Sequence, residues 1–234
     1  MVMMGKVVDD INAQMPYDVY PQDRDQPTFK AYLTIVVRNE KGDIIKVHKQ
    51  WSHSPTFNFM GLLLPTNWYS QTGSTWTIKN TSGTSFTWNT GIGNNYNSLY
   101  YPESGTNYQS YLVMIQVGAG SQSNPYNSYS LAAPIANGSG TGQLLYGQPS
   151  ISQTPTVSGS SVSFTITQTL NNQSGGTVTI TEVGIIIDIH TWDINTQRYQ
   201  DFGNVLVWYD VLSSSISISN GGSITIYYTF AVNP

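Results

Sequence analysis

The stretch DVLSSSISISNGGSITIYYTF, residues 210–230, alternates apolar and hydroxyl side chains on both sides of Asn-Gly-Gly and carries no charge between its ends. A period of two places apolar side chains on one face of a β-strand and polar ones on the other. Two such runs around a short Gly-containing turn predict a β-hairpin with a three-residue loop at 220–222. In the predicted register, Ile218 opposes Ile224, Ile216 opposes Ile226 and Leu212 opposes Phe230.

The apolar face of this hairpin is predicted to enter the core, which leaves a ladder of Ser, Thr and Tyr facing outward. Exposed strands usually carry charges that prevent pairing with another chain. An uncharged outer face therefore predicts contact with neighbouring protein. The residues expected at this assembly interface are Ser217, Thr225 and Tyr227.

The same alternation of apolar and polar side chains recurs along the chain. Residues 33–47 predict a hairpin in which Val37 opposes Ile45 and Ile35 opposes Val47, with a three-residue loop at 40–42. Val162, Phe164 and Ile166 share one strand face. The apolar phase slips near Glu182, which predicts a β-bulge there.

One helix is expected, starting with Ser54 as its cap and Pro55 in its first turn and ending before Pro65. With eight to ten short strands besides, the chain is predicted to be all-β, a two-sheet antiparallel sandwich resembling a jelly roll. Residues 29–234 form the predicted sandwich domain, with a long crossover loop at 118–150. Residues 1–28 form a predicted N-terminal arm.

The arm mixes acids, prolines and scattered apolar residues without a sustained period. Two interpretations stay open: a disordered leader, or an arm that becomes ordered on a neighbouring subunit. The apolar residues that such an arm would bury are Met1, Val2, Met3, Met4, Val7 and Val8.

Charged residues make up 9% of the 234-residue chain, against roughly 25% in an ordinary soluble domain. A neutral polar surface is poorly protected against self-association, which favours a protein covered by neighbours or one that works outside cells. The net charge of −4 and the lack of a basic stripe argue against a nucleic-acid partner. No membrane-spanning segment is predicted, and the start has no signal-peptide pattern, so synthesis in the cytoplasm is expected.

Catalytic chemistry has little support in the sequence. The chain has no cysteine, which excludes thiolate metal sites and cysteine nucleophiles. Asp188, His190 and Asp193 are weak metal or acid–base candidates, and polar residues at a strand end are the simpler interpretation. A hydrolytic carboxylate pair would come from Glu103, Glu182, Asp188, Asp193, Asp201 and Asp210, but nothing marks one. No enzyme activity and no cofactor are therefore predicted.

Aromatic residues among Asn, Ser and Gly offer an alternative binding function. Such a combination builds sugar-stacking platforms, although aromatic side chains also fill cores and interfaces. The candidate glycan-binding residues are Trp68, Trp76, Trp88, Tyr100 and Tyr101.

Four segments in order, IVVRNEKGDIIKVHKQWSHSPTFNFMGLLL, YSLAAPIANGSGTGQLLYG, FTITQTLNNQSGGTVTITEVGIII and DVLSSSISISNGGSITIYYTF, resemble virion structural proteins. These largely uncharacterised proteins belong to tailed phages and to viruses of thermophilic prokaryotes. The likeness lies in the residue composition of these segments and in their order over residues 30–232, and not in an active-site motif. It implies a capsid or tail component without enzymatic residues, and the absence of cysteine would suit a hot environment.

The leading expectation is thus a self-assembling virion subunit that binds copies of itself and other virion proteins through strand edges, loops and the arm. Its predicted location is the virion, after synthesis in the host cytoplasm. The alternatives are a carbohydrate-binding module or receptor-binding adhesin that binds a host glycan, and a subunit of an extracellular filament.

Overall fold

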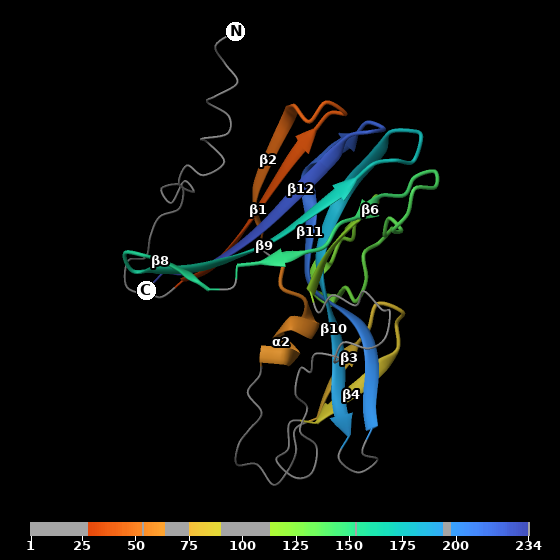
Figure 1. Cartoon of the computed structure of the whole chain (residues 1–234). Helices are drawn as coiled ribbons and strands as arrows, with labels where there is room; N and C mark the ends of the chain where they lie inside the picture. Colours follow the sequence, from red (N-terminus) through yellow and green to blue (C-terminus); the bar gives the residue numbers. More distant parts are fainter. Residues whose placement is uncertain are drawn as a thin grey trace.

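Two antiparallel sheets packed face to face form the body of the chain (Figure 1). The computed structural model describes residues 28–52, 54–63, 75–89, 113–152, 154–193 and 198–233. The predicted all-β sandwich with one short helix is confirmed. None of the helices in these ranges is long and apolar enough to cross a membrane.

The larger sheet, sheet A, has four long strands in the order β2-β1-β12-β9. These strands are β1 (Thr28–Arg38), β2 (Ile44–Ser52), β9 (Ser161–Asn171) and β12 (Ser223–Asn233). The far side of β9 pairs with three short strands, β6 (Leu145–Tyr146), β7 (Ser150–Ile151) and β8 (Thr156–Ser158). Short edge strands leave little unpaired backbone for another chain to use.

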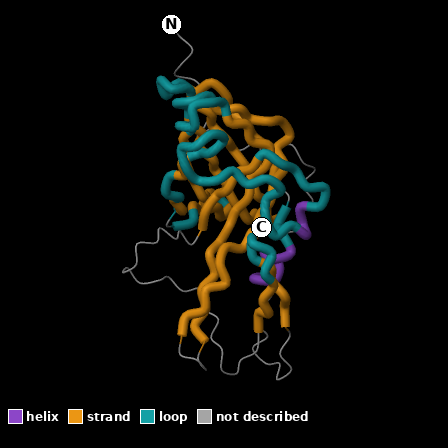
Figure 2. The backbone as a smooth tube through the Cα atoms, turned by 90° about the vertical axis from the view of Figure 1, so that its right-hand side faces the viewer, coloured by secondary structure: helices purple, strands orange, loops and turns teal. Residues whose placement is uncertain are grey.

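The smaller sheet, sheet B, has the order β11-β10-β5. Its strands are β5 (Val113–Gly118), β10 (Val178–Asp193) and β11 (Arg198–Ile218). A separate pair, β3 (Thr75–Lys79) and β4 (Ser85–Asn89), lies beside the projecting ends of β10 and β11 (Figure 2). Thr81 donates its backbone N–H to the carbonyl of Asn204 at 2.8 Å, which ties this pair to β11.

The core between the sheets is aliphatic. Inward side chains of β1 and β12, such as Leu33, Ile35 and Ile226, pack with Ile180 and Ile216 of sheet B, and all five are fully buried. Their alternation with polar residues explains the strands, because burial of one face drives sheet packing.

The loop between β5 and β6 forms a third layer over the outer face of sheet B, and it includes a short 3-10 helix, η1 (Pro125–Asn127). Leu131 of this loop packs in a second buried cluster with Ile186, Leu206 and Tyr209. The carboxylate of Glu182 holds the loop, accepting backbone N–H groups of Gly120, Ala132 and Ala133 at 2.8–3.1 Å. The middle of sheet B is therefore covered on both faces by its own chain, whereas outward residues near the end of β11, such as Ser215 and Ser217, are exposed.

Two glutamines join the sheets along their sides. Gln50 of β2 donates to the carbonyl of Val211 and accepts the N–H of Ser213 on β11. On the other side, the buried Gln168 of β9 accepts the N–H of Ile115 on β5 at 2.6 Å. These side-chain hydrogen bonds fasten both long sides of sheet B to sheet A.

The predicted hairpin over residues 210–230 is wrong in its pairing. Strand β11 pairs with β10 in sheet B, whereas β12 pairs with β1 and β9 in sheet A. The turn at 220–222 crosses between the sheets, with Gly221 at φ +79° and its N–H bonded to the carbonyl of Asn172. The expected burial of the isoleucines is nevertheless confirmed, because both apolar faces enter the same core from opposite sheets.

The predicted register of the first hairpin is also wrong. Val37 pairs with Lys46 and Ile35 pairs with His48, because a bulge next to Arg38 shifts the ladder by one residue. Ile45 is consequently 57% exposed. Gly42 in this turn has φ +84°, a left-handed conformation that glycine adopts readily.

The helix, α2 (Phe57–Leu63), starts later than predicted. Its first turn is capped by Thr56, whose hydroxyl oxygen accepts the N–H of Phe59, rather than by Ser54. Pro55 forms an isolated bridge with Trp208 of β11 instead of entering the helix. Phe59 packs its ring edge-on against Trp208, with 5.3 Å between the ring centroids, so the helix is anchored to sheet B.

Candidate functional site

A row of exposed apolar side chains crosses four strands at one end of sheet A. Phe29 pairs with Val232, Val232 with Val162, and Val162 with Val157. Directly paired residues point to the same face of a sheet, so these four side chains lie side by side. They are 52%, 43%, 43% and 70% exposed in the order Phe29, Val232, Val162 and Val157.

This row lies on the face of sheet A that elsewhere forms the core. Along β9, side chains of one face pass from 5% exposed at Ile166 to 38% at Phe164 and 43% at Val162. The end of sheet A that carries β8 projects to the left in Figure 1, away from sheet B. The exposed surface of Phe29, Val157, Val162, Phe164 and Val232 is called the apolar shelf below.

Aromatic stacking connects the shelf to the core. Phe230 is 5% exposed, and its ring stacks with Phe164 on one side and Phe29 on the other, at centroid distances of 5.1 and 5.9 Å. Trp208 meets Phe230 edge-on at 5.1 Å. Such packing restricts the rings, so the shelf is a preformed surface.

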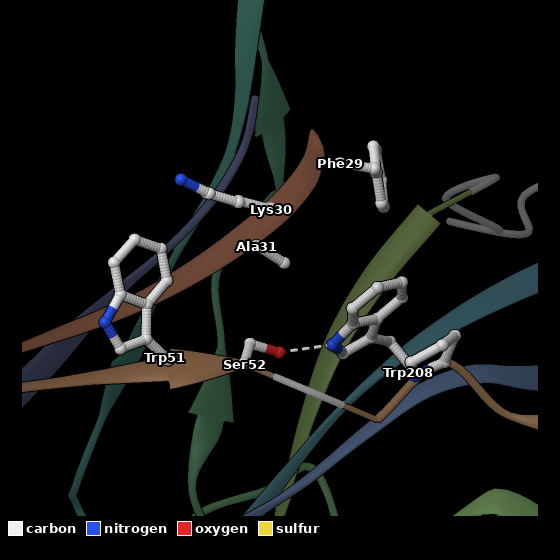
Figure 3. A pocket seen from close by; sticks show the side chains of 7 residues that line it. Phe29, Lys30, Ala31, Trp51, Ser52 and Trp208 are labelled. Atoms are coloured by element: carbon white, nitrogen blue, oxygen red, sulfur yellow. Dashed lines mark hydrogen bonds between the residues drawn. The ribbon is translucent and has the colours of Figure 1, made fainter. Parts of the chain in front are cut away.

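A pocket of about 370 Å³ adjoins the shelf at Phe29. Its other lining residues are Lys30, Ala31, Trp51, Ser52, Pro55 and Trp208. Figure 3 shows the Trp51 and Trp208 side chains on either side of Ser52, with Phe29 and Lys30 on β1. Three of the seven lining residues are aromatic, and Ala31 and Pro55 add apolar surface, so the pocket suits apolar groups.

The inner wall of the pocket is a buried polar network that joins the two sheets. The indole N–H of Trp208 donates to the Ser52 hydroxyl, and Ser52 donates to a carboxylate oxygen of Asp210. Tyr228 donates to the same oxygen of Asp210 at 2.8 Å. Burial, followed by the charge of Asp210 and this hydrogen bond, raises the pKa of the Tyr228 hydroxyl well above its usual range.

Because Asp210 is only 4% exposed and accepts two hydroxyl donors, it holds the two sheets together. Among the described residues, no group of three or more His, Asp or Glu side chains is placed to hold a metal ion. The arrangement at this end of the sandwich is therefore suited to binding apolar side chains.

A second extended surface is the outer face of sheet A. On β9 and β12 this face carries hydroxyl pairs, with Thr165 bonded to Thr229 and Thr169 to Thr225 at 3.0 Å each. The outward residues of these two strands from 163 to 169 and from 223 to 231 include no charge.

The predicted assembly residues do not share one surface. Thr225 and Tyr227 lie on the outer face of sheet A, whereas Ser217 lies on the outer side of sheet B, where its hydroxyl bonds with Thr179. The single uncharged face predicted for residues 210–230 is thus wrong, because the two strands belong to opposite sheets. The six apolar residues of the predicted arm lie outside the described residues.

The catalytic candidates are not assembled into a described site. Asp188 is half-buried opposite Asn204 on β11, and the side chains of His190, Asp193 and Asp201 lie outside the described residues, as does Glu103. Glu182 is fully buried beside a register shift after Ile180, which confirms the predicted bulge. Its carboxylate is occupied by backbone N–H groups and Tyr209, so its role is structural.

For the glycan candidates, the backbone places Trp76 directly opposite Trp88 in the β3–β4 ladder. Their side chains lie outside the described part of the chain, as do Trp68, Tyr100 and Tyr101 entirely. The shelf itself was missed at the sequence level, because Val162 and Phe164 have the same alternation as the buried Ile166. No family model, no curated protein and no solved structure matches the chain.

Proposed function

We propose that the chain is a self-assembling, non-enzymatic structural subunit of a virus particle, either a capsid or a tail component. The observation that carries this proposal is the apolar shelf, a core-type sheet face that continues into solvent at one end of the sandwich. Contiguous apolar surface of this kind marks interaction sites in soluble proteins.

The chemistry of the shelf favours a protein partner. Its members are three valines and two phenylalanines, which offer no hydrogen-bonding side chain to a sugar. Removing apolar area from water is favourable by about 25 cal/mol per Å², so a neighbour's apolar side chains stabilise the complex by covering the row. Polar ligands gain nothing comparable on such a surface.

The outer face of sheet A supplies a second contact surface. On β9 and β12 its hydroxyl pairs are satisfied within the sheet, and the outward residues from 163 to 169 and from 223 to 231 carry no charge that would repel a second flat face. Lys30, Arg38 and Lys49 lie on the neighbouring part of this face, on β1 and β2. A subunit with two separate contact surfaces is able to extend into a shell or tube rather than stop at a dimer. The likeness of the sequence texture to virion proteins supports the particle over a filament.

The test is the assembly state of the full chain across concentration, measured by sedimentation velocity and viewed by electron microscopy. Concentration-dependent growth into regular particles or tubes is expected, and Val162→Asp is expected to suppress it. Met60→Asp is the matched control, because Met60 is a comparably exposed apolar residue, 48% against 43% for Val162, and it lies on α2 outside both proposed contact surfaces. A full-length chain that stays monomeric at every concentration would rule the proposal out.

A second candidate is a glycan-binding module, favoured by the pairing of Trp76 with Trp88. Directly opposed positions of a ladder share one face of the sheet, and aromatic residues are the ones on which sugar rings stack. Glycan-array binding that is lost in Trp76→Ala, with the circular dichroism spectrum unchanged, supports this function. Binding that survives in both Trp76→Ala and Trp88→Ala contradicts it.

A further inference from the structure

We propose that the apolar shelf of one copy binds the first eight residues of a second copy. The proposal rests on the self-assembly proposed above and names the partner segment for it. It is carried by the composition of that segment, by the point at which the segment joins the fold, and by the character of the residues between them.

The segment MVMMGKVV matches the shelf chemically. Six of its eight residues are Met or Val, and Lys6 is its one charge. Methionine is flexible and polarisable, so it fills irregular apolar surfaces and makes favourable contacts with aromatic rings. The shelf supplies such rings at Phe29 and Phe164, and the pocket beside Phe29 adds the ring of Trp208.

The chain joins the fold at the border of the shelf. Strand β1 begins at Thr28, and Phe29 is a shelf residue. The preceding 27 residues span at most about 90 Å when extended, at roughly 3.3 Å per residue. That reach is several times the length of a strand, so residues 1–8 are able to contact the shelf of an adjacent copy.

The connecting residues 9–27 favour a second copy over the chain's own shelf. They contain five aspartates, one arginine and three prolines. In linkers generally, like charges repel one another and prolines add stiffness. A sequence of this composition therefore favours contact with a second copy over a turn back onto the chain's own shelf.

The absence of cysteine allows a direct test in the full-length chain. Met4→Cys is introduced into one copy and Val162→Cys into another copy that carries a mass tag, and the two are mixed and oxidised. A disulfide between the two chains is expected in roughly tenfold higher yield than for the matched pair of Met4→Cys with Ile45→Cys. A tenfold ratio corresponds to a modest preference of residues 1–8 for the shelf over the surface at Ile45. Ile45 is exposed on sheet A but lies outside the shelf.

Three results would overturn the proposal. The first is an equal disulfide yield of Met4→Cys with Val162→Cys and with Ile45→Cys. The second is a majority of disulfides between two Val162→Cys chains, which indicates shelf-to-shelf packing. The third is a disulfide that forms within one chain when the Met4→Cys/Val162→Cys double variant is diluted. If sedimentation shows assembly while these disulfides fail, the partner segment is wrong and the self-assembly proposal stands. A chain that never associates contradicts the self-assembly proposal itself, and with it the partner segment that rests on that proposal.

A double-mutant cycle gives an independent measurement on the full chain. Val162→Asp and Met4→Asp are each expected to raise the concentration needed for association about ten- to hundredfold, because each places a charge where apolar surface would otherwise be buried. Since both variants disrupt the same interaction, the double variant is expected to be no weaker than the worse single variant. Strictly additive effects would show that the two residues do not meet.

Discussion

Tyr209 donates its hydroxyl hydrogen to a carboxylate oxygen of Glu182 at 2.6 Å, and both side chains are fully buried. The same carboxylate accepts three backbone N–H groups from the loop that covers sheet B. Glu182 is thus the point at which the third layer is fastened to the sandwich. This layer covers the part of sheet B around Glu182 and leaves the outward residues Ser213, Ser215 and Ser217 of β11 exposed.

Replacement of Glu182 by Gln is expected to destabilise the chain by about 2–4 kcal/mol. One of the two buried carboxylate oxygens, which accept hydrogen bonds, is then replaced by an amide N–H₂ group, which only donates. The Gln N–H₂ group would face at least one of the donors now bonded to Glu182, such as the N–H of Ala132. Urea unfolding followed by tryptophan fluorescence measures the loss. Tyr209→Phe, which keeps the backbone bonds to the carboxylate, is expected to cost less, and a reversed order contradicts this view of the loop.

Gly118→Ala tests the close packing around the same carboxylate. A Cβ at Gly118 would lie 2.2 Å from an oxygen of Glu182 and 2.7 Å from the carbonyl oxygen of Ala133. Overpacking of this kind costs roughly 1–3 kcal/mol. The matched control is Gly176→Ala, where a Cβ would meet nothing within 4 Å. Equal unfolding midpoints for the two variants would show that the loop yields without cost.

Alternation in the sequence predicted which side chains of β11 and β12 are buried, but it could not predict their partners. Ile216 and Ile224 point into the same core whether their strands pair in one hairpin or face each other across a sandwich. The choice depends on β1 and β9, which are distant in the sequence and supply the hydrogen bonds of β12. Long-range pairing of this kind leaves no local signal.

The shelf could not be predicted for a related reason. Val162 and Ile166 have the same phase on β9, and their burial differs because sheet B covers one and not the other. How far one sheet extends over another is a property of the packed molecule. In contrast, the bulge next to Glu182 was predictable, because a phase slip in the apolar pattern is a local signal.

Alkaline pH is expected to destabilise the chain through its buried tyrosines. Burial raises the pKa of Tyr146 to about 12, with the backbone of Val117 opposing it, and burial also raises the pKa values of Tyr209 and Tyr228. Below the ordinary tyrosine pKa of about 10, both the folded and unfolded chains are protonated and the full stability is present. Above it the unfolded chain releases protons first, so stability falls by about 1.4 kcal/mol per pH unit per tyrosine.

The measurement is the free energy of unfolding from pH 7 to pH 12. A plateau to about pH 10, followed by a steep decline, is expected from the tyrosine pKa values. In Tyr146→Phe the fall of the unfolding free energy with pH is expected to be shallower by the contribution of one tyrosine. The variant is expected to be less stable at neutral pH, because it lacks the hydrogen bond from the Tyr146 hydroxyl to the carbonyl of Ile135. Identical slopes in the two proteins would show that Tyr146 does not contribute.

Separate lysine substitutions distinguish the two outer faces of the sandwich. Thr225 lies on the outer face of sheet A in a hydroxyl pair with Thr169, whereas Ser217 lies on sheet B in a pair with Thr179. Thr225→Lys is expected to weaken assembly of the full chain, because a charge would enter the uncharged β9–β12 part of the contact face and be desolvated there. Ser217→Lys is expected to leave assembly unchanged, because the proposed contact face belongs to sheet A and not to sheet B. The free energy of unfolding of both variants should lie within about 1 kcal/mol of that of the natural chain, as is usual for surface substitutions.

The measurement is sedimentation velocity of the three proteins at matched concentrations. If Ser217→Lys alone impairs assembly, the contact face lies on sheet B. If neither variant impairs assembly, the outer faces play no part in it.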